Sequence, residues 1–218
     1  MPTDSIHSPA SAIAWRLLLQ RAGADPTLGP DLFARLHSYY SSPGRAYHHL
    51  GHVGHVLLVV SALAGYCPQP VAVRLAAWLH DAVYLPGTGD NEEQSAVLAQ
   101  KWLTELQLPY LLCEETPRLI RLTATHDALP SDANAAVLLD ADLAILGAPP
   151  SSYDAYARAI RREFAHVEQS AYRSGRAQLL ARFLARPTIY RTPPLRALYE
   201  APARSNLARE LAALQRKK

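Results

Sequence analysis

The sequence predicts an all-α protein, a single-domain helical bundle of about nine helices, and three observations support this. Apolar residues recur at positions i, i+3, i+4 and i+7 in several segments, which is the stripe of an amphipathic helix. No stretch alternates between apolar and polar residues as a half-buried strand does. Proline and glycine fall between the helical segments, where helices end.

The individual elements follow from this pattern. Amphipathic helices are predicted over residues 71–84, 91–106 and 154–167, and a helical tail over residues 195–214. Pro202 lies inside that tail and predicts a kink or a restart, because proline removes one helical hydrogen bond.

Capping residues predict where two of these helices begin. Asp90 and Asn91 precede the acids Glu92 and Glu93, which favour the first turn of a helix. Pro117 follows a threonine and predicts another helix start, since proline is favoured at the first helical position.

Length and composition indicate one folded domain. The chain has 218 residues, of which 49% are hydrophobic and 19% charged, so it can build a core and is not of a disordered type. Cys67 and Cys113 are too few for a disulfide framework, and we expect buried thiols in a reducing environment. The longest apolar run, residues 56–66, is too short to span a bilayer. Residues 1–11 contain no apolar segment typical of a secretion signal, so we expect a cytoplasmic protein without a membrane partner.

Charge is unevenly distributed along the chain. Residues 1–150 hold 8 basic and 14 acidic residues, a net charge of −6, whereas residues 151–218 hold 14 and 5, a net charge of +9. Most of these C-terminal cations are arginines, whose guanidinium groups suit phosphate or carboxylate. The segment indicates either an anionic ligand or a solvated helical surface. The arginines lack interleaved aromatic residues, which argues against a nucleic-acid groove.

A first group of candidate metal ligands lies in a histidine-rich segment. His48 and His52 are four residues apart and are expected to share one helix face, and His55 follows them. Histidines with this spacing either bind a metal ion or form a polar, solvated face.

Two further groups place acids in apolar surroundings. His80 and Asp81 close a strongly apolar helix, and Asp140 and Asp142 lie in a segment that is otherwise hydrophobic. A carboxylate without a partner is costly in a protein core, and a bound cation offsets that cost. These groups therefore point to a metal site between helices.

The order of these residues resembles the signature of the HD superfamily of metal-dependent phosphohydrolases. That signature has a helix histidine, an adjacent His-Asp pair and a later Asp, here His52, His80-Asp81 and Asp142. From residue 45 to about 211 the chain is also similar to a bacterial group of HD phosphohydrolases, through segments such as YHHLGH, AWLHDAVY and LDADLAILG. The resemblance implies an HD-type domain with a catalytic core at about 31–168, followed by a basic helical extension at about 169–218.

The resemblance also implies roles for the residues. His52, His80, Asp81 and Asp142 are the implied metal ligands, with Asp142 preferred to Asp140 because an Ala-Asp pair before a hydrophobic residue is common in the superfamily. His48 is the implied general acid. The remaining candidates are the acids Glu92 and Glu93 for a catalytic role, His126 for substrate or a second metal, and Arg45, Arg161 and Arg162 for phosphate.

The expected function is the hydrolysis of a phosphate ester or anhydride of a nucleotide or a related small metabolite, by attack of metal-bound hydroxide. The expected cofactor is a divalent ion, and two histidines with two aspartates suit Mn, Mg, Co, Ni, Zn or Fe. Two alternatives stay open: an HD-type di-iron oxygenase, and a non-catalytic module that binds nucleotides or nucleic acid. The sequence also leaves a homodimer open.

Overall fold

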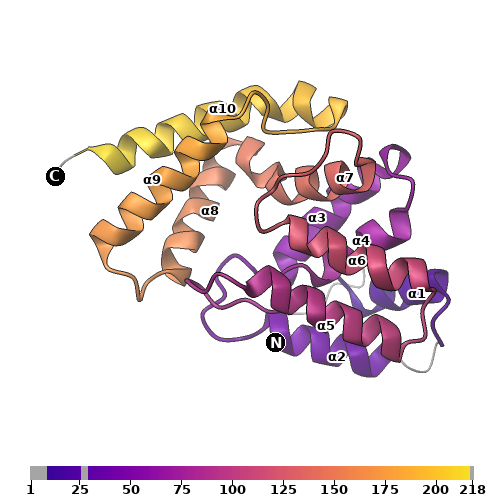
Figure 1. Ribbon diagram of the computed structural model, residues 1–218. Coiled ribbons are helices and arrows are strands. Elements are labelled where there is room, and N and C mark those ends of the chain that lie inside the picture. Colours follow the sequence, from indigo (N-terminus) through magenta and orange to yellow (C-terminus); the bar gives the residue numbers. More distant parts are fainter. Residues whose placement is uncertain (1–8, 26–28, 217–218) are drawn as a thin grey trace. The chain divides into compact units, whose positions relative to one another are not determined.

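In the computed structural model, which describes residues 9–25 and 29–216, all regular secondary structure is helical (Figure 1). The described residues form ten α-helices and two short 3-10 helices, which confirms the all-α prediction. The α-helices are α1 (Ala12–Ala22), α2 (Gly29–Tyr40), α3 (Leu50–Ala62), α4 (Pro70–Leu79), α5 (Asn91–Glu105), α6 (Tyr110–Leu122), α7 (Ala133–Asp142), α8 (Pro150–Glu163), α9 (Gln169–Ala185) and α10 (Pro193–Gln215). The 3-10 helices are η1 (Ala64–Tyr66) and η2 (Leu143–Gly147).

The chain divides into two compact units, Met1–Asp142 and Leu143–Lys218. The first unit contains α1–α7 and η1, and the second contains η2 and α8–α10. The division falls directly after one of the candidate metal ligands, whereas the sequence placed the end of the catalytic core near residue 168. The single HD-type domain stays a prediction.

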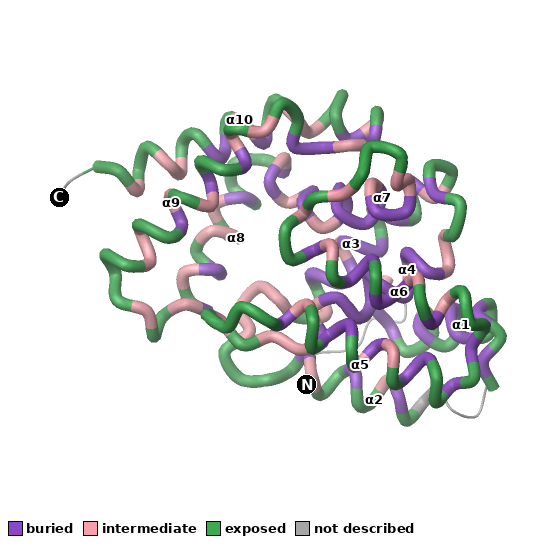
Figure 2. The backbone as a smooth tube through the Cα atoms, viewed as in Figure 1, coloured by how far each residue is buried: buried purple, intermediate pink, exposed green. Residues whose placement is uncertain are grey.

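The core of the first unit is built around α4. This helix contacts α1, α3, α5, α6 and α7, and its residues from Leu75 to Leu79 are fully or almost fully buried (Figure 2). Trp78 packs edge-on against Trp15, with ring centroids 5.3 Å apart. The hydroxyl of Tyr40 donates a hydrogen bond to the carbonyl of Trp78 at 2.9 Å. Except for Arg74, the side chains of α4 are apolar, because other helices surround most of it.

Helix α4 ends at Leu79, five residues earlier than the sequence pattern predicted. The reason is that side chains bind the backbone beyond this point. Arg45 donates hydrogen bonds to the carbonyls of Asp81 and Ala82. The hydroxyl of Ser95 bonds both the amide and the carbonyl of Val83. Because side chains already form hydrogen bonds with these backbone groups, they do not need the hydrogen bonds of a continued helix.

The other predicted boundaries are mixed. Helix α5 begins at Asn91 with Asp90 as its N-cap residue, as predicted. The prediction for Pro117 is wrong, because α6 already begins at Tyr110 and contains Pro117 in its interior. Pro109, which precedes α6, marks the actual start. Helix α10 continues through Pro202 as a single assigned helix, so no restart occurs there.

Buried polar contacts link the helices within the second unit to one another. The side-chain amide of Asn206 donates to the carbonyls of Leu146 and Ala148, both at 2.9 Å. The guanidinium of Arg176 forms two hydrogen bonds with Glu210, at 2.9 and 3.1 Å. Each donor is matched by an acceptor, so these polar groups are buried without a large desolvation cost.

The prediction of buried thiols is confirmed, because Cys67 and Cys113 are free and buried. None of the described helices combines the length and the apolar character needed to cross a membrane.

The contacts of Asn206 give a stability prediction. Replacing Asn206 by Ala leaves two buried carbonyls without donors, which should lower the free energy of unfolding by about 2–4 kcal/mol. The measurement is the urea midpoint. Gln215→Ala, on the exposed end of the same helix, is the control and should change stability by no more than about 0.5 kcal/mol. Equal midpoints for the two variants would contradict the assigned role.

Candidate metal centre

The ends of three helices bring four of the predicted ligands together. His52 lies in the first turn of α3, His80 and Asp81 directly follow α4, and Asp142 is the last residue of α7. Helix α3 packs against both α4 and α7, and α4 packs against α7. The apolar faces of these helices therefore hold the four polar side chains in one place.

The distances between the ligand atoms are short and similar. The Nε2 atoms of His52 and His80 lie 3.1 Å apart. One oxygen of Asp81 lies 3.4 and 3.1 Å from these two nitrogen atoms, and one oxygen of Asp142 lies 3.1 and 3.5 Å from them. His52, His80 and Asp81 are thus close enough to hold a metal ion, and Asp142 places a further carboxylate oxygen beside the two histidines.

This spacing fits the size of a coordination sphere. Metal–nitrogen and metal–oxygen bonds of about 2.0–2.2 Å in a tetrahedral site separate the ligand atoms by roughly 3.4 Å. The Nδ1 atom of His80 lies 3.1 Å from the carbonyl of Ala77, and since a carbonyl only accepts, Nδ1 carries the proton. With Nδ1 protonated, Nε2 is the ring nitrogen of His80 that faces His52 and the two carboxylates, which is the arrangement of a metal-binding histidine.

The electrostatics of the cluster favour positive charge at its centre. Burial alone would lower the pKa of His52 and His80, but Asp81 and Asp142 outweigh burial and raise both. Burial alone would raise the pKa of each carboxyl group, but the histidines, His80 most strongly, hold both pKa values well below the usual range. The cluster is therefore a buried anionic site that needs cationic charge, which a divalent ion would supply.

His126 extends the cluster on the side of Asp142. Its Nε2 atom lies 2.8 Å from the second carboxylate oxygen of Asp142, and its backbone is left-handed, with φ of +50°. Asp142 therefore has one oxygen toward His52 and His80 and the other toward His126. This arrangement is consistent with the predicted second-metal or substrate role of His126, which stays a prediction.

His48 lies beside the cluster, but not on the helix that the spacing predicted. Helix α3 begins at Leu50, and His48 lies in the turn before it. The helix starts there because the His49 ring accepts a hydrogen bond from the amide of Gly51 and caps it. A Cβ at position 51 would lie 2.6 Å from that ring, so glycine permits the cap. The prediction of a shared helix face is wrong.

Aromatic contacts nevertheless hold His48 near the ligands. Its ring centroid lies 5.8 Å from that of His52 and 4.1 Å from that of Tyr84. Tyr47 packs against both His48 and His52. Sequence reasoning missed Tyr47 and Tyr84 as supporting residues, although both stand next to the motif residues.

Arg45 braces the backbone of the site. Its guanidinium donates to the carbonyls of His48, Asp81 and Ala82 at 2.7–2.8 Å. One side chain thus ties the turn that carries the candidate general acid to the turn that carries a candidate ligand. The predicted contact of Arg45 with a substrate phosphate stays a prediction.

The predicted acids Glu92 and Glu93 are not brought into the cluster by any contact found in the described residues. Both lie in the first turn of α5. The carboxylate of Glu93 forms two hydrogen bonds with Arg121, at 2.6 and 2.8 Å, and this interaction lowers its pKa. Asp140 is fully buried within α7, and it is Asp142 that contacts the two histidines.

The arginines of the basic C-terminal segment include several that brace its own helices. Arg161 donates to the carbonyls of Phe164 and Val167 and to the side chain of Gln169 at the turn between α8 and α9. Arg204 donates to the carbonyls of Leu184 and Arg186 near the end of α9. Part of the +9 charge therefore serves the structure of the second unit. The substrate roles of Arg161 and Arg162 stay predictions.

Comparisons with known proteins add no relative. Neither a scan against protein-family models nor searches of curated proteins and of solved structures found a match to this chain.

The geometry distinguishes the two candidate aspartates. Asp142→Asn removes a carboxylate that contacts both histidines, and we expect the affinity for Mn²⁺ to fall by at least about 100-fold, more than the loss of a residue outside the ligand set. Asp140→Asn is the matched control and should change the affinity by less than about threefold. Isothermal titration of both proteins with Mn²⁺ gives the comparison, and a larger effect at position 140 would reverse the assignment.

The contacts of Arg45 predict an indirect effect on the same site. Arg45→Gln should weaken Mn²⁺ binding by about 10-fold, because residues that orient metal ligands typically have effects of this size. Arg45→Lys should restore only part of the affinity, since an ammonium group cannot bond three separate carbonyls in the same geometry. Unchanged affinity in Arg45→Gln would show that the turns hold their positions without it.

Proposed function

We propose that this protein is a metal-dependent phosphohydrolase of the HD type, acting on a small phosphorylated metabolite such as a nucleotide. The observation that carries the proposal is the cluster of four ligand atoms in His52, His80, Asp81 and Asp142. These residues occur in the order of the HD signature, and the separations between the two histidine nitrogens, and between each of them and the two carboxylates, are 3.1–3.5 Å.

Two imidazoles and two carboxylates suit a divalent ion. A divalent ion held here would lower the pKa of a bound water molecule and so make hydroxide available at neutral pH. In the proposal, the two histidines and two aspartates hold the ion, and the two carboxylates balance its charge. The turns that carry Asp81 and His48 are held by Arg45.

His48 is the proposed proton donor to the leaving oxygen. Its ring lies beside the cluster, with its centroid 5.8 Å from that of His52, and it is partly exposed. Packing against Tyr84 limits its rotation, which suits a residue that must present one nitrogen atom to a substrate. Positioned proton transfer of this kind contributes about 10²–10⁴ to a rate.

A specific contact also supports a second candidate, an HD-type oxygenase with two irons. His126 binds the oxygen of Asp142 that faces away from His52 and His80, as a ligand of a second ion would. Metal content separates the candidates: two irons per chain with oxygen consumption would favour the oxygenase, and one activating ion with phosphate release would favour the hydrolase.

The test is phosphate release from a panel of nucleotides and sugar phosphates with Mn²⁺. We expect activity that chelation abolishes and that His80→Ala eliminates. His48→Gln should lower kcat by about 10²–10⁴ and leave Mn²⁺ affinity unchanged, because His48 acts on the leaving group rather than on the ion.

His55→Gln is the matched control for that experiment. His55 lies one turn along α3 from His52 and forms none of the short contacts of the cluster found in the described residues, so its loss should change kcat by less than about twofold. Activity in His80→Ala with added metal, or equal effects of the two glutamine substitutions, would contradict the proposal.

A further inference from the structure

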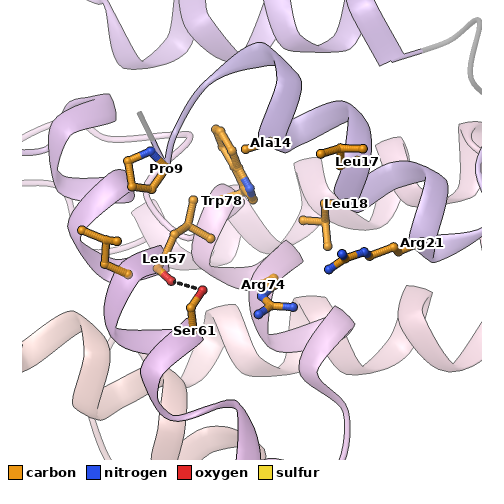
Figure 3. A pocket seen from close by; sticks show the side chains of 10 residues that line it. Pro9, Ala14, Leu17, Leu18, Arg21, Leu57, Ser61, Arg74 and Trp78 are labelled. Atoms are coloured by element: carbon orange, nitrogen blue, oxygen red, sulfur yellow. Dashed lines mark hydrogen bonds between the residues drawn. The ribbon is translucent and has the colours of Figure 1, made fainter. Parts of the chain in front are cut away.

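A second concave site lies in the first unit, where α1, α3 and α4 meet. It is a pocket of about 280 Å³ (Figure 3). Four leucines form much of its wall: Leu17, Leu18, Leu57 and Leu58. Trp78, which is 1% exposed, lines its buried side. The volume approaches the lower end of the range for small-molecule sites.

The polar side chains of the pocket lie away from the candidate metal centre along the chain, although its apolar lining residues Leu57 and Trp78 lie five residues after His52 and two residues before His80. Ser61, which lines the pocket, lies nine residues beyond His52 on α3, and Arg74 lies six residues before His80 on α4. At 1.5 Å per residue these separations are about 13 and 9 Å along the helix axes. None of the four candidate ligands lines the pocket.

Large aliphatic side chains remain uncovered at this site. Leu17 is 48% and Leu58 is 57% exposed, although each borders the same pocket. Neighbouring exposed leucines around a concavity indicate a surface that another apolar group covers. Because this wall is leucine-rich, it suits an aliphatic chain.

Two cations stand at the same pocket. Arg21, from the last turn of α1, and Arg74, from α4, both line it, and in Figure 3 their guanidinium groups extend toward one another. Within the described residues neither forms a hydrogen bond or an ion pair, whereas Arg118, Arg121, Arg176, Arg204 and Arg209 all have carboxylate partners. Arg74 is half-buried. Two guanidinium groups that have no acidic partner within residues 9–25 and 29–216, beside an apolar wall, leave a place for an anion.

We propose that this pocket binds an aliphatic carboxylate, with its alkyl chain against the leucines and its carboxylate between Arg21 and Arg74. Arg74 is half-buried and Arg21 is exposed. Arg74 would be the stronger partner, because its hydrogen bonds to the bound carboxylate would be less exposed to water. A single negative charge on an apolar chain matches both parts of the pocket.

The experiment measures binding of octanoate to the full chain by isothermal titration and by its tryptophan fluorescence, to which Trp78 in the pocket wall contributes. Arg74→Gln should weaken binding by about tenfold, and Arg21→Gln by about threefold. Arg16→Gln, an exposed arginine of α1 that does not line the pocket, is the matched control and should bind as the unaltered protein does. Octan-1-ol, which has the same chain length without the charge, should bind more weakly than octanoate.

A filling substitution tests the location. Ala14 lines the pocket, and Ala14→Phe should abolish octanoate binding while its circular dichroism and melting temperature show that it is folded. The proposal is overturned if octanoate does not bind at millimolar concentration, if octan-1-ol binds equally well, or if Arg74→Gln binds as tightly as Arg16→Gln. The arginine variants decide the matter even if Ala14→Phe fails to fold. Metal binding is not measured, so the outcome is independent of the proposed hydrolase.

Discussion

The central constraint on this structure is that two buried imidazoles and two largely buried carboxylates meet at the edge of an apolar core. Such a group is stable only when the negative charges have cationic partners. The fold meets this need by ending α4 and α7 at the cluster and starting α3 beside it, so that one residue from a helix start and three from helix ends converge. The apolar packing of α4 against α3 and α7 supplies the free energy that holds these polar groups in place.

Helix ends are costly places in a core, because their carbonyl and amide groups lack helical partners. Here side chains satisfy them. Arg45 binds the carbonyls that follow α4, Ser95 binds the backbone of Val83, and His49 caps the start of α3. The residues that close the helices are thus the residues that set the positions of the candidate ligands, so folding and site formation depend on the same hydrogen bonds.

The helical class could be predicted from local patterns, whereas the choice of the four clustered residues, with Asp142 rather than Asp140, came from the resemblance to the HD signature. Acids within apolar runs, such as Asp81 and Asp142, indicate a buried partner whatever the fold. The limits of helices were harder to predict, because distant side chains decide them: α4 stops where Arg45, 34 residues before its last residue, binds the backbone beyond it.

Interactions outside the local sequence pattern also explain the two helix starts that were predicted wrongly. Pro117 matched the local signature of a first helical residue, but α6 begins seven residues earlier, at Tyr110, directly after its N-cap residue Pro109. His48 had helical spacing to His52, yet the ring of His49 capped the helix after it. The pairing of Glu93 with Arg121 is likewise a contact between two helices that no local pattern encodes.

At His126 the backbone conformation and the side-chain contact favour different residues. At a φ of +50° a glycine would be free of the steric cost that side chains carry there, so the backbone alone would favour the smallest residue. Only an imidazole, however, provides the nitrogen atom that reaches Asp142. His126→Gly would therefore relieve the backbone and at the same time remove the contact with Asp142. A stable, folded His126→Gly protein would not show that the site still works.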